Sequence, residues 1–173
     1  MQFETPRLRL RPWSGDDRDA FAALHADPEV MVDAVAPLDR GESDAKLDRY
    51  IALYDTVGYG RWYVETRKGE FLGYVGVMPS WPGHPLAPHD EIGWRLARSA
   101  WGHGYATEAA RAALDDVFTR CGLTEVLAYT APDNLRSQAV INRLELRRDP
   151  ARDYSMRDGP RIWHGLTWVA TRP

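Results

Sequence analysis

Hydrophobic and polar positions follow two periods along the chain, and each period predicts one kind of element. Where apolar and charged residues alternate one by one, as at Leu8 and Leu10 among arginines, we expect half-buried strands. Where apolar residues recur three or four positions apart, as at Phe21 and Leu24, we expect helices that bury one face. Glycine and proline clusters separate these segments and predict the turns.

The pattern predicts an ordered series of strands and helices. Strands are expected at Leu8–Leu10, Arg61–Thr66, Glu70–Met78, Asp90–Ala97, Glu125–Ala131 and Ile162–Ala170. Helices are expected after the capping pair Ser14 and Asp17, from Asp27-Pro28-Glu29, after the cap Ser43, over Thr107–Arg120 and over Asn134–Leu144. Turns or loops are expected at Arg67–Gly69, Pro79–Pro88 and Tyr154–Gly159. This order predicts a single mixed α/β domain over residues 1–173.

Composition narrows the classes of function. The chain has 173 residues, 44% of them hydrophobic and 27% charged, and a net charge of -3. These values are typical of a globular protein without the positive field that favours nucleic acid. No apolar run approaches the roughly 20 residues of a membrane span, and the charged N-terminus is unlike a signal peptide. We therefore expect a cytoplasmic protein with neither a nucleic-acid nor a membrane partner.

A glycine-rich turn, Trp101–Ala106 (WGHGYA), leads from a predicted strand directly into the predicted helix Thr107–Arg120. Gly102 and Gly104 permit a close backbone approach that side chains block. The N–H groups of the following helical turn are unpaired, which makes this turn a candidate anion site. The lysine of a P-loop is missing, and Thr107 replaces the third glycine of a dinucleotide fingerprint. Two glycines alone are equally compatible with a tight strand–helix connection.

The sequence segments around this turn resemble those of a known family. Glu91–Leu96 (EIGWRL) and Trp101–Ala109 (WGHGYATEA) resemble motif A of the GNAT superfamily of acetyltransferases, in the form of its RimJ/RimL-like branch. Glu4–Pro12 (ETPRLRLRP), Asp27–Met31 (DPEVM) and Asn134–Leu144 (NLRSQAVINRL) are similar to further words of that branch, in the same order. The resemblance therefore spans nearly the whole chain.

The resemblance implies both a fold and an activity. The expected fold is the GNAT fold, of the α/β (α+β) class: one domain with a mixed, mostly antiparallel central sheet and helices on both faces. The expected activity is direct transfer of an acetyl group from acetyl-CoA, as cosubstrate, to a primary amine. No metal is expected, because the spacing of His84, His89 and His103 fits no zinc pattern.

The cofactor residues follow from the same comparison. The backbone amides of Gly102, His103, Gly104, Tyr105, Ala106 and Thr107 are expected to hold the pyrophosphate. The strand residues Trp94, Arg95 and Leu96 are expected beside the pantetheine arm. Asn134 is expected to bind the amides of this arm, to act as a helix cap, or to do both. The resemblance places Ser137 beside the thioester sulfur, although the preference of serine for helix starts favours a plain polar helix residue.

Glu91 is the main candidate for the catalytic base, acting directly or through one water, with Asp90 and His89 as weaker candidates. A solvated acid at a strand end is the alternative reading of Glu91. Many GNAT enzymes carry a tyrosine as general acid seven residues after the asparagine, but Ile141 stands there and has no proton to donate. Ser137 is the remaining candidate beside the leaving thiolate.

At the end of the predicted helix Asn134–Leu144, the segment Arg143–Leu146 (RLEL) lacks the glycine and the aromatic residue that the RimJ/RimL-like branch has there. We therefore expect an altered helix terminus without loss of cofactor binding.

The acceptor amine is less defined by the sequence. Trp13, Met31, Trp81 and His84 are the main candidates to bind it, and further aromatic or histidine candidates are Tyr59, Trp62, Trp163 and His164. For each aromatic residue among them the composition favours a core position, and Trp81 and His84, in the proline-rich loop, have the better case for function. The acceptor is expected to be a protein N-terminal α-amine or a small amine such as an amino acid, a polyamine or an antibiotic. A non-catalytic acyl-CoA-binding module, and either a monomer or a homodimer, remain alternatives.

Overall fold

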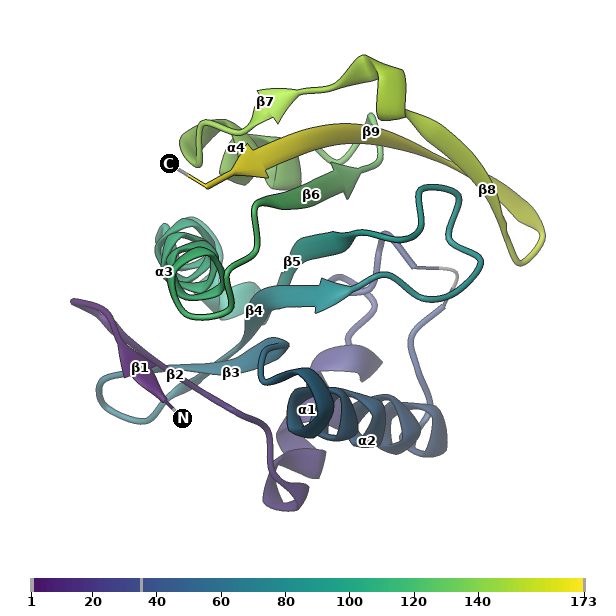
Figure 1. Cartoon of the computed structure of the whole chain (residues 1–173). Helices are drawn as coiled ribbons and strands as arrows, with labels where there is room; N and C mark the ends of the chain where they lie inside the picture. The colour runs from purple at the N-terminus through teal and green to yellow at the C-terminus, as the bar shows by residue number, and fades with distance from the viewer. Residues whose placement is uncertain (1, 35, 173) are drawn as a thin grey trace.

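The computed structural model describes residues 2–34 and 36–172, which form one long sheet flanked by helices (Figure 1). The ends of the predicted domain, residues 1 and 173, lie outside this description. The strands are β1 (Phe3–Glu4), β2 (Leu8–Arg11), β3 (Arg61–Thr66), β4 (Phe71–Pro79), β5 (Asp90–Leu96), β6 (Glu125–Thr130), β7 (Arg147–Arg148), β8 (Tyr154–Asp158) and β9 (Arg161–Thr171). The helices are α1 (Arg18–Ala26), α2 (Arg40–Val57), α3 (Tyr105–Thr119) and α4 (Leu135–Arg143). Short 3-10 segments lie at Gly15–Asp17, Arg98–Ala100 and Pro150–Arg152.

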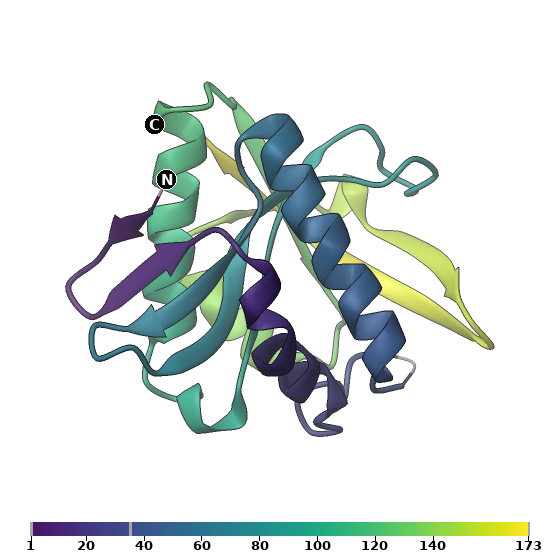
Figure 2. The same ribbon diagram turned by 90° about the horizontal axis from the view of Figure 1, so that it is seen from below.

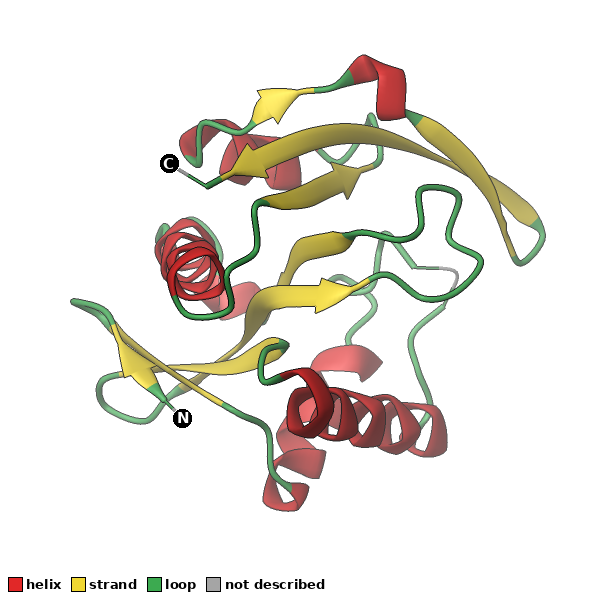
Figure 3. Ribbon diagram, in the orientation of Figure 1, coloured by secondary structure: helices red, strands yellow, loops and turns green. Residues whose placement is uncertain are grey.

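The strands lie in the order β1-β2-β3-β4-β5-β6-β9-β7, and β8 pairs with β9 outside this path (Figure 3). Every neighbouring pair is antiparallel except β5 and β6, which are parallel. The prediction of a mixed, mostly antiparallel sheet is therefore confirmed.

Helices cover both faces of this sheet. On β4, Tyr74 packs with Phe21 and Leu24 of α1, whereas Val75 belongs to the core that includes Ala113 of α3. Neighbouring residues of a strand point to opposite faces, so α1 and α3 cover opposite faces. Figure 2 shows α2 crossing the same face as α1. The prediction of helices on both faces is confirmed.

The sheet opens between β5 and β6. Along its whole length β5 pairs with β4, from Asp90 opposite Pro79 to Leu96 opposite Gly73. With β6 it shares a single pair, Glu91 opposite Leu127. Beyond that pair the two strands separate, so backbone groups of β5 that face away from β4 are left without a strand partner. This opening positions the site described below.

The second predicted helix, from Asp27-Pro28-Glu29, is a single turn of chain instead. Met31 N–H donates to Asp27 C=O as one helical turn would require. The Val30 carbonyl, which would accept from Ala34 N–H in a continuing helix, instead accepts a hydrogen bond from Arg95 Nη1 at 2.6 Å, and Ala34 N–H donates to Met31 C=O. Since this arginine takes the carbonyl that would continue the helix, the segment stays a loop, here called loop 27–34.

The start of α2 also differs from the prediction. Asp39, not Ser43, caps the helix: its side chain accepts from Glu42 N–H, and the Glu42 side chain accepts from Asp39 N–H. Ser43 is buried inside the first turns. Both residues suit a helix start, but the reciprocal pair three residues apart is available only to Asp39.

The segment Tyr154–Gly159, predicted as a turn, contains a strand. β8 pairs with β9 from Tyr154 opposite Gly165 to Asp158 opposite Arg161, so the turn is confined to Gly159 and Pro160. The polar residues of this segment suggested a turn, and only the pairing with the long β9 makes them a strand.

The end of α4 forms a regular helix stop. The missing glycine of the segment Arg143–Leu146 predicts an altered one instead. Glu145 N–H donates to Asn142 C=O and Leu146 N–H donates to Ile141 C=O, which together form a Schellman motif. The motif places Glu145 at φ 59°, where glycine is usual. The prediction of an altered terminus is therefore wrong, because glutamate adopts the left-handed conformation itself.

Within the described part of the chain, none of the helices combines the length and the apolar character that crossing a membrane requires.

Candidate active site

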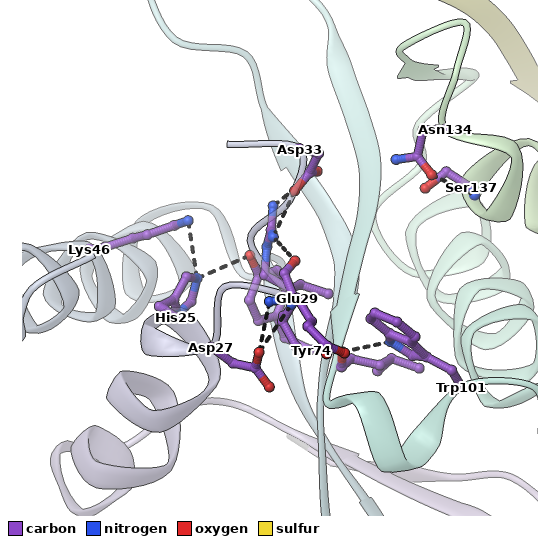
Figure 4. Close-up of polar contacts among 12 residues, drawn as sticks. His25, Asp27, Glu29, Asp33, Lys46, Tyr74, Trp101, Asn134 and Ser137 are labelled. Carbon is purple, nitrogen blue, oxygen red and sulfur yellow. Dashed lines mark hydrogen bonds and ion pairs between the residues drawn. The ribbon is translucent and has the colours of Figure 1, made fainter. Parts of the chain in front are cut away.

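A cleft of about 530 Å³ lies where β5 and β6 separate. Its walls come from the end of β5, the turn before α3, the first turns of α3 and α4, and loop 27–34 (Figure 4). All of the residues that the sequence assigned to the cofactor line this one cleft: Trp94, Arg95, Leu96, Gly102, His103, Gly104, Tyr105, Ala106, Thr107, Asn134 and Ser137.

The glycine turn presents unpaired donors to the cleft. Gly102 and Gly104 both have φ 79°, which L-amino acids rarely adopt. No group in residues 2–34 or 36–172 accepts a hydrogen bond from the backbone N–H of residues 102 to 107. The hydroxyl of Thr107 is also buried without a partner. A Cβ on Gly102 would meet no atom within 4 Å, so there is open space in front of this backbone.

Two polar side chains face the cleft from α4. Asn134 caps this helix, because its Oδ1 accepts from Ser137 N–H at 3.1 Å. With its oxygen used in the cap, the amide nitrogen of Asn134 points across the cleft toward β5, and the Ser137 hydroxyl lies next to it (Figure 4). Asn134 can therefore serve as helix cap and as ligand donor at the same time.

Aromatic and cationic groups complete the walls on this side. The indole Nε1 of Trp101 donates to Leu96 C=O at 2.9 Å, which fixes the ring at the end of β5. Arg136 lies over this ring, with Cζ 4.1 Å from its centroid, and Arg143 also lines the cleft. These arginines supply the local positive charge that an acidic chain needs to bind an anion.

Arg95 lines the cleft but directs its guanidinium to loop 27–34. Nη1 donates to Val30 C=O at 2.6 Å and to Asp33 Oδ1 at 2.9 Å, and Nη2 donates to Asp33 Oδ2 at 3.2 Å (Figure 4). Arg95 therefore fastens this loop to β5, and the loop contributes Glu29, Val30 and Val32 to the wall.

Glu91 lies outside the lining of the cleft, on the face of β5 that α2 covers. Arg61 from β3 pairs with it: Nη2 donates to Glu91 Oε1, and Nη1 donates to Glu91 C=O at 3.2 Å. The guanidinium crosses the sheet above Gly93, where an added Cβ would lie only 2.7 Å from Nη2. Burial raises the pKa of the Glu91 carboxyl above its ordinary value, and Arg61 works in the opposite direction.

An aromatic cluster involves the proline-rich loop Pro79–Pro88, which precedes Glu91 in the chain. His84, Tyr129 and Tyr154 pack together with His89, and Leu86 N–H donates to His84 Nδ1 at 3.0 Å. The proton of that imidazole is therefore on Nε2, which donates to the Tyr154 hydroxyl at 3.0 Å. Burial, and then His89, lower the pKa of His84 to about 4, so this ring is neutral at pH 7.

The predicted acceptor residues do not meet in one place. Trp13 is buried against Phe21, with ring centroids 4.9 Å apart, and Met31 is also buried; both are core residues outside the cleft lining. His84 is buried in the aromatic cluster, and Trp81 touches it from the surface with 47% of its area exposed. The residues share aromatic or apolar character, which the sequence alone does not divide between core and pocket.

Two residues near the site were not predicted, Arg61 and Arg136. A cationic residue at the start of an otherwise apolar strand, as in Arg61-Trp62-Tyr63-Val64, signals a buried partner. The partner, Glu91, is thirty positions away and follows only from the strand pairing. Arg136 lies in the segment Asn134–Leu144, whose resemblance to the family indicated Asn134 and Ser137. Nothing in this segment predicts the contact of Arg136 with Trp101.

No group of three or more His, Cys, Asp or Glu side chains in the described ranges is arranged to hold a metal ion. His84 and His89 lie in the aromatic cluster, while His103 lies in the glycine turn and stacks on Tyr105.

Comparison with known proteins identifies the family. Residues 7–147 match the model of the acetyltransferase (GNAT) domain. An uncharacterized N-acetyltransferase, p20 of Bacillus licheniformis, is 36% identical over 159 residues, which cover 90% of this chain and 88% of that protein.

Solved structures agree with this match. An acetyltransferase from Agrobacterium tumefaciens is similar with a TM-score of 0.81 and 29% identity, over 98% of this chain and 94% of that one. The RimJ of Mycobacterium smegmatis in complex with CoA-disulfide has a TM-score of 0.75 and 20% identity, over 95% and 81% of the two chains. With an open β5–β6 pair, unpaired amides at the start of α3 and a family match over most of its length, the chain belongs to the GNAT family and is an acetyl-CoA-dependent N-acetyltransferase.

Proposed function

We propose that this enzyme belongs to the RimJ/RimL-like branch and acetylates the α-amine at the N-terminus of a polypeptide. The observation that carries the site assignment is the row of unpaired N–H groups over residues 102 to 107, at the start of α3 and open to the cleft. An array of amides at a helix N-terminus suits a pyrophosphate. The unpartnered Thr107 hydroxyl and the open space at Gly102 support the same placement.

The remaining cofactor residues are assigned along the cleft. The pantetheine arm would lie along Trp94–Leu96, where β5 has no strand partner and can offer its backbone groups. Asn134 would donate its amide N–H groups to the arm, since its oxygen is already used in the helix cap. Arg136 and Arg143 would add positive charge beside the phosphates.

The reaction needs one base and one donor to the leaving group. The amine nitrogen forms a bond to the thioester carbon while the carbon–sulfur bond breaks. The amine proton goes to the Glu91 carboxylate, directly or through one water. The Ser137 hydroxyl donates a hydrogen bond to the departing thiolate, which then takes a proton from water. Burial raises the pKa of the Glu91 carboxyl and so makes it a stronger base, while Arg61 favours its ionised form and orients it.

The pairing of the carboxylates Glu29 and Asp33, which line the cleft, and of Glu91 favours an amine with a single positive charge. Asp33 is paired with Arg95, Glu29 with Arg98, and Glu91 with Arg61. A polyamine would need carboxylates that are not already neutralised. A terminal α-amine, with a pKa of about 8, is also closer to its neutral, reactive form at pH 7 than a lysine amine at about 10.4. A small-molecule monoamine is the second candidate.

The test is the release of the CoA thiol from acetyl-CoA in the presence of N-terminal peptides, free amino acids and spermidine. We expect turnover with peptides, and a fall in kcat of about a hundredfold or more in Glu91→Gln with unchanged CoA affinity. Glu65→Gln is the control, because Glu65 is a buried carboxylate paired with Arg9 on the same sheet. Turnover with spermidine alone would contradict the acceptor assignment, and full activity of Glu91→Gln would contradict the role of this base.

A further inference from the structure

Glu108 is an acidic residue in the first turn of α3, close to the unpaired amides. Its N–H donates to Gly104 C=O at 3.1 Å, so it directly follows the turn. A carboxylate at a helix N-terminus stabilises the helix. Glu108 lies outside the cleft lining, but its negative charge in the same helical turn would still repel a bound pyrophosphate, so this charge needs compensation.

The N-terminal segment supplies that compensation. Thr5 Oγ1 donates to Glu108 Oε1 at 2.5 Å, and Arg7 N–H donates to the same oxygen at 3.0 Å. Arg7 Nε donates to Oε2 at 2.6 Å. Thr5 is fixed in turn, because Leu8 N–H donates to its hydroxyl at 3.0 Å. Both carboxylate oxygens of Glu108 are therefore held by residues about a hundred positions away in the chain.

Arg7 also holds the glycine turn itself. Nη1 donates to His103 C=O at 2.9 Å, and the guanidinium lies over the Tyr105 ring, 4.8 Å from its centroid. Nη2 lies 3.5 Å from the point that a Cβ on Gly104 would occupy. Because the His103 carbonyl accepts from Arg7, it points away from the side of the turn on which the backbone amides are unpaired. Neither Thr5 nor Arg7 lines the cleft.

From this arrangement we infer that Arg7 is a positioning residue for the CoA pyrophosphate: it neutralises Glu108 and fixes the His103 carbonyl, so that the turn presents only donors to the phosphates. The inference rests on the proposed placement of the pyrophosphate at residues 102 to 107. It also gives a physical reason why the words Glu4–Pro12 and Trp101–Ala109 occur together, since β1–β2 and the start of α3 form one unit.

The experiment is a double-mutant cycle on CoA affinity, measured by isothermal titration calorimetry with Arg7→Met, Glu108→Gln and the double variant. We expect Arg7→Met to weaken CoA binding about tenfold, because it leaves an uncompensated carboxylate near the pyrophosphate. The double variant should recover most of this loss. The glutamine oxygen of this variant can still accept from the Thr5 hydroxyl and from the backbone N–H at position 7, while the negative charge is gone.

Arg9→Met is the matched control, because Arg9, two residues further along and in β2, pairs with the carboxylate of Glu65 in β3 at 2.9 Å, outside the cleft lining. It should leave CoA affinity unchanged. Wild-type affinity in Arg7→Met would overturn the inference, and a double variant as weak as Arg7→Met would overturn the neutralising role of Arg7. Failure of the wild-type protein to bind CoA would instead overturn the proposed function together with this inference.

Discussion

Glu145 illustrates how one residue can depart from the family pattern while the backbone does not. It occupies the left-handed position of the Schellman motif at the end of α4, with φ 59°. For an L-residue this conformation costs roughly 1–2 kcal/mol, which glycine avoids. The surrounding hydrogen bonds from Glu145 and Leu146 hold the turn against that cost.

Replacing Glu145 by glycine should therefore stabilise the protein by about 1 kcal/mol and raise Tm by about 2–4 °C. Thermal unfolding of both proteins checks this. Gly122→Ala is the converse control, since Gly122 follows α3 at φ 72° with no atom within 4 Å of an added Cβ. It should lower Tm through backbone strain alone. An equal or lower Tm for Glu145→Gly would contradict this account.

At the scale of elements, the turn before α3 combines a left-handed glycine with a position on the cleft wall, two properties that do not occur together in the turn between β3 and β4. Gly104 has φ 79° and also faces the cleft. Gly69, in the turn between β3 and β4, has φ 84° and open space around it but lies outside the cleft lining. The two glycines therefore carry similar backbone strain when substituted, and only one carries the proposed ligand contact.

We expect Gly104→Val to abolish detectable CoA binding, because a β-branched side chain at this φ forces the backbone to change and fills the approach to the amides. Gly69→Val should lower Tm to a similar extent and retain CoA affinity. Calorimetric titration of both variants, after circular dichroism confirms folding, makes the comparison. Retained affinity in a folded Gly104→Val protein would contradict the placement of the pyrophosphate.

At the scale of the whole molecule, a buried histidine ties stability to pH. His25 of α1 is fully buried: its Nδ1 donates to Phe21 C=O at 2.9 Å, and Lys46 donates to its Nε2 at 3.2 Å. Burial, and then the charge of Lys46, lower the pKa of His25 to about 3. His84 is lowered to about 4 in the same way.

The unfolded chain binds protons at these histidines from about pH 6.5 downward, whereas the folded protein does not until its lower pKa values are reached. The contribution of these two histidines to stability is therefore fully present above about pH 6.5 and is lost as the pH decreases. At pH 5 we expect each histidine to cost about 2 kcal/mol of the free energy of unfolding. Urea unfolding at pH 7 and pH 5 should show this loss, and His25→Gln should reduce its size by about half. A loss of the same size in that variant would contradict the role of His25.

Most of the elements could be predicted from the sequence, because a strand or helix depends on periodicity and turn chemistry among neighbouring residues. The hairpin of β3 and β4, the strand–turn–helix at Gly102 and Gly104, and α4 are such cases. The missing helix after Asp27 followed from a partner that the local pattern does not contain, Arg95. The misplaced cap at Ser43 instead overlooked a local signal, the pair of Asp39 and Glu42 three residues apart.

The sequence by itself determined the order of elements and, through local words, the residues that line the cleft. The tertiary structure alone decided three things: that Glu91 is paired with Arg61, that Arg7 holds Glu108, and that Trp13 belongs to the core. The physical reason is the same in each case. Periodicity states which face a side chain occupies, whereas its partner on that face is set by strand register and helix packing between residues far apart in the chain.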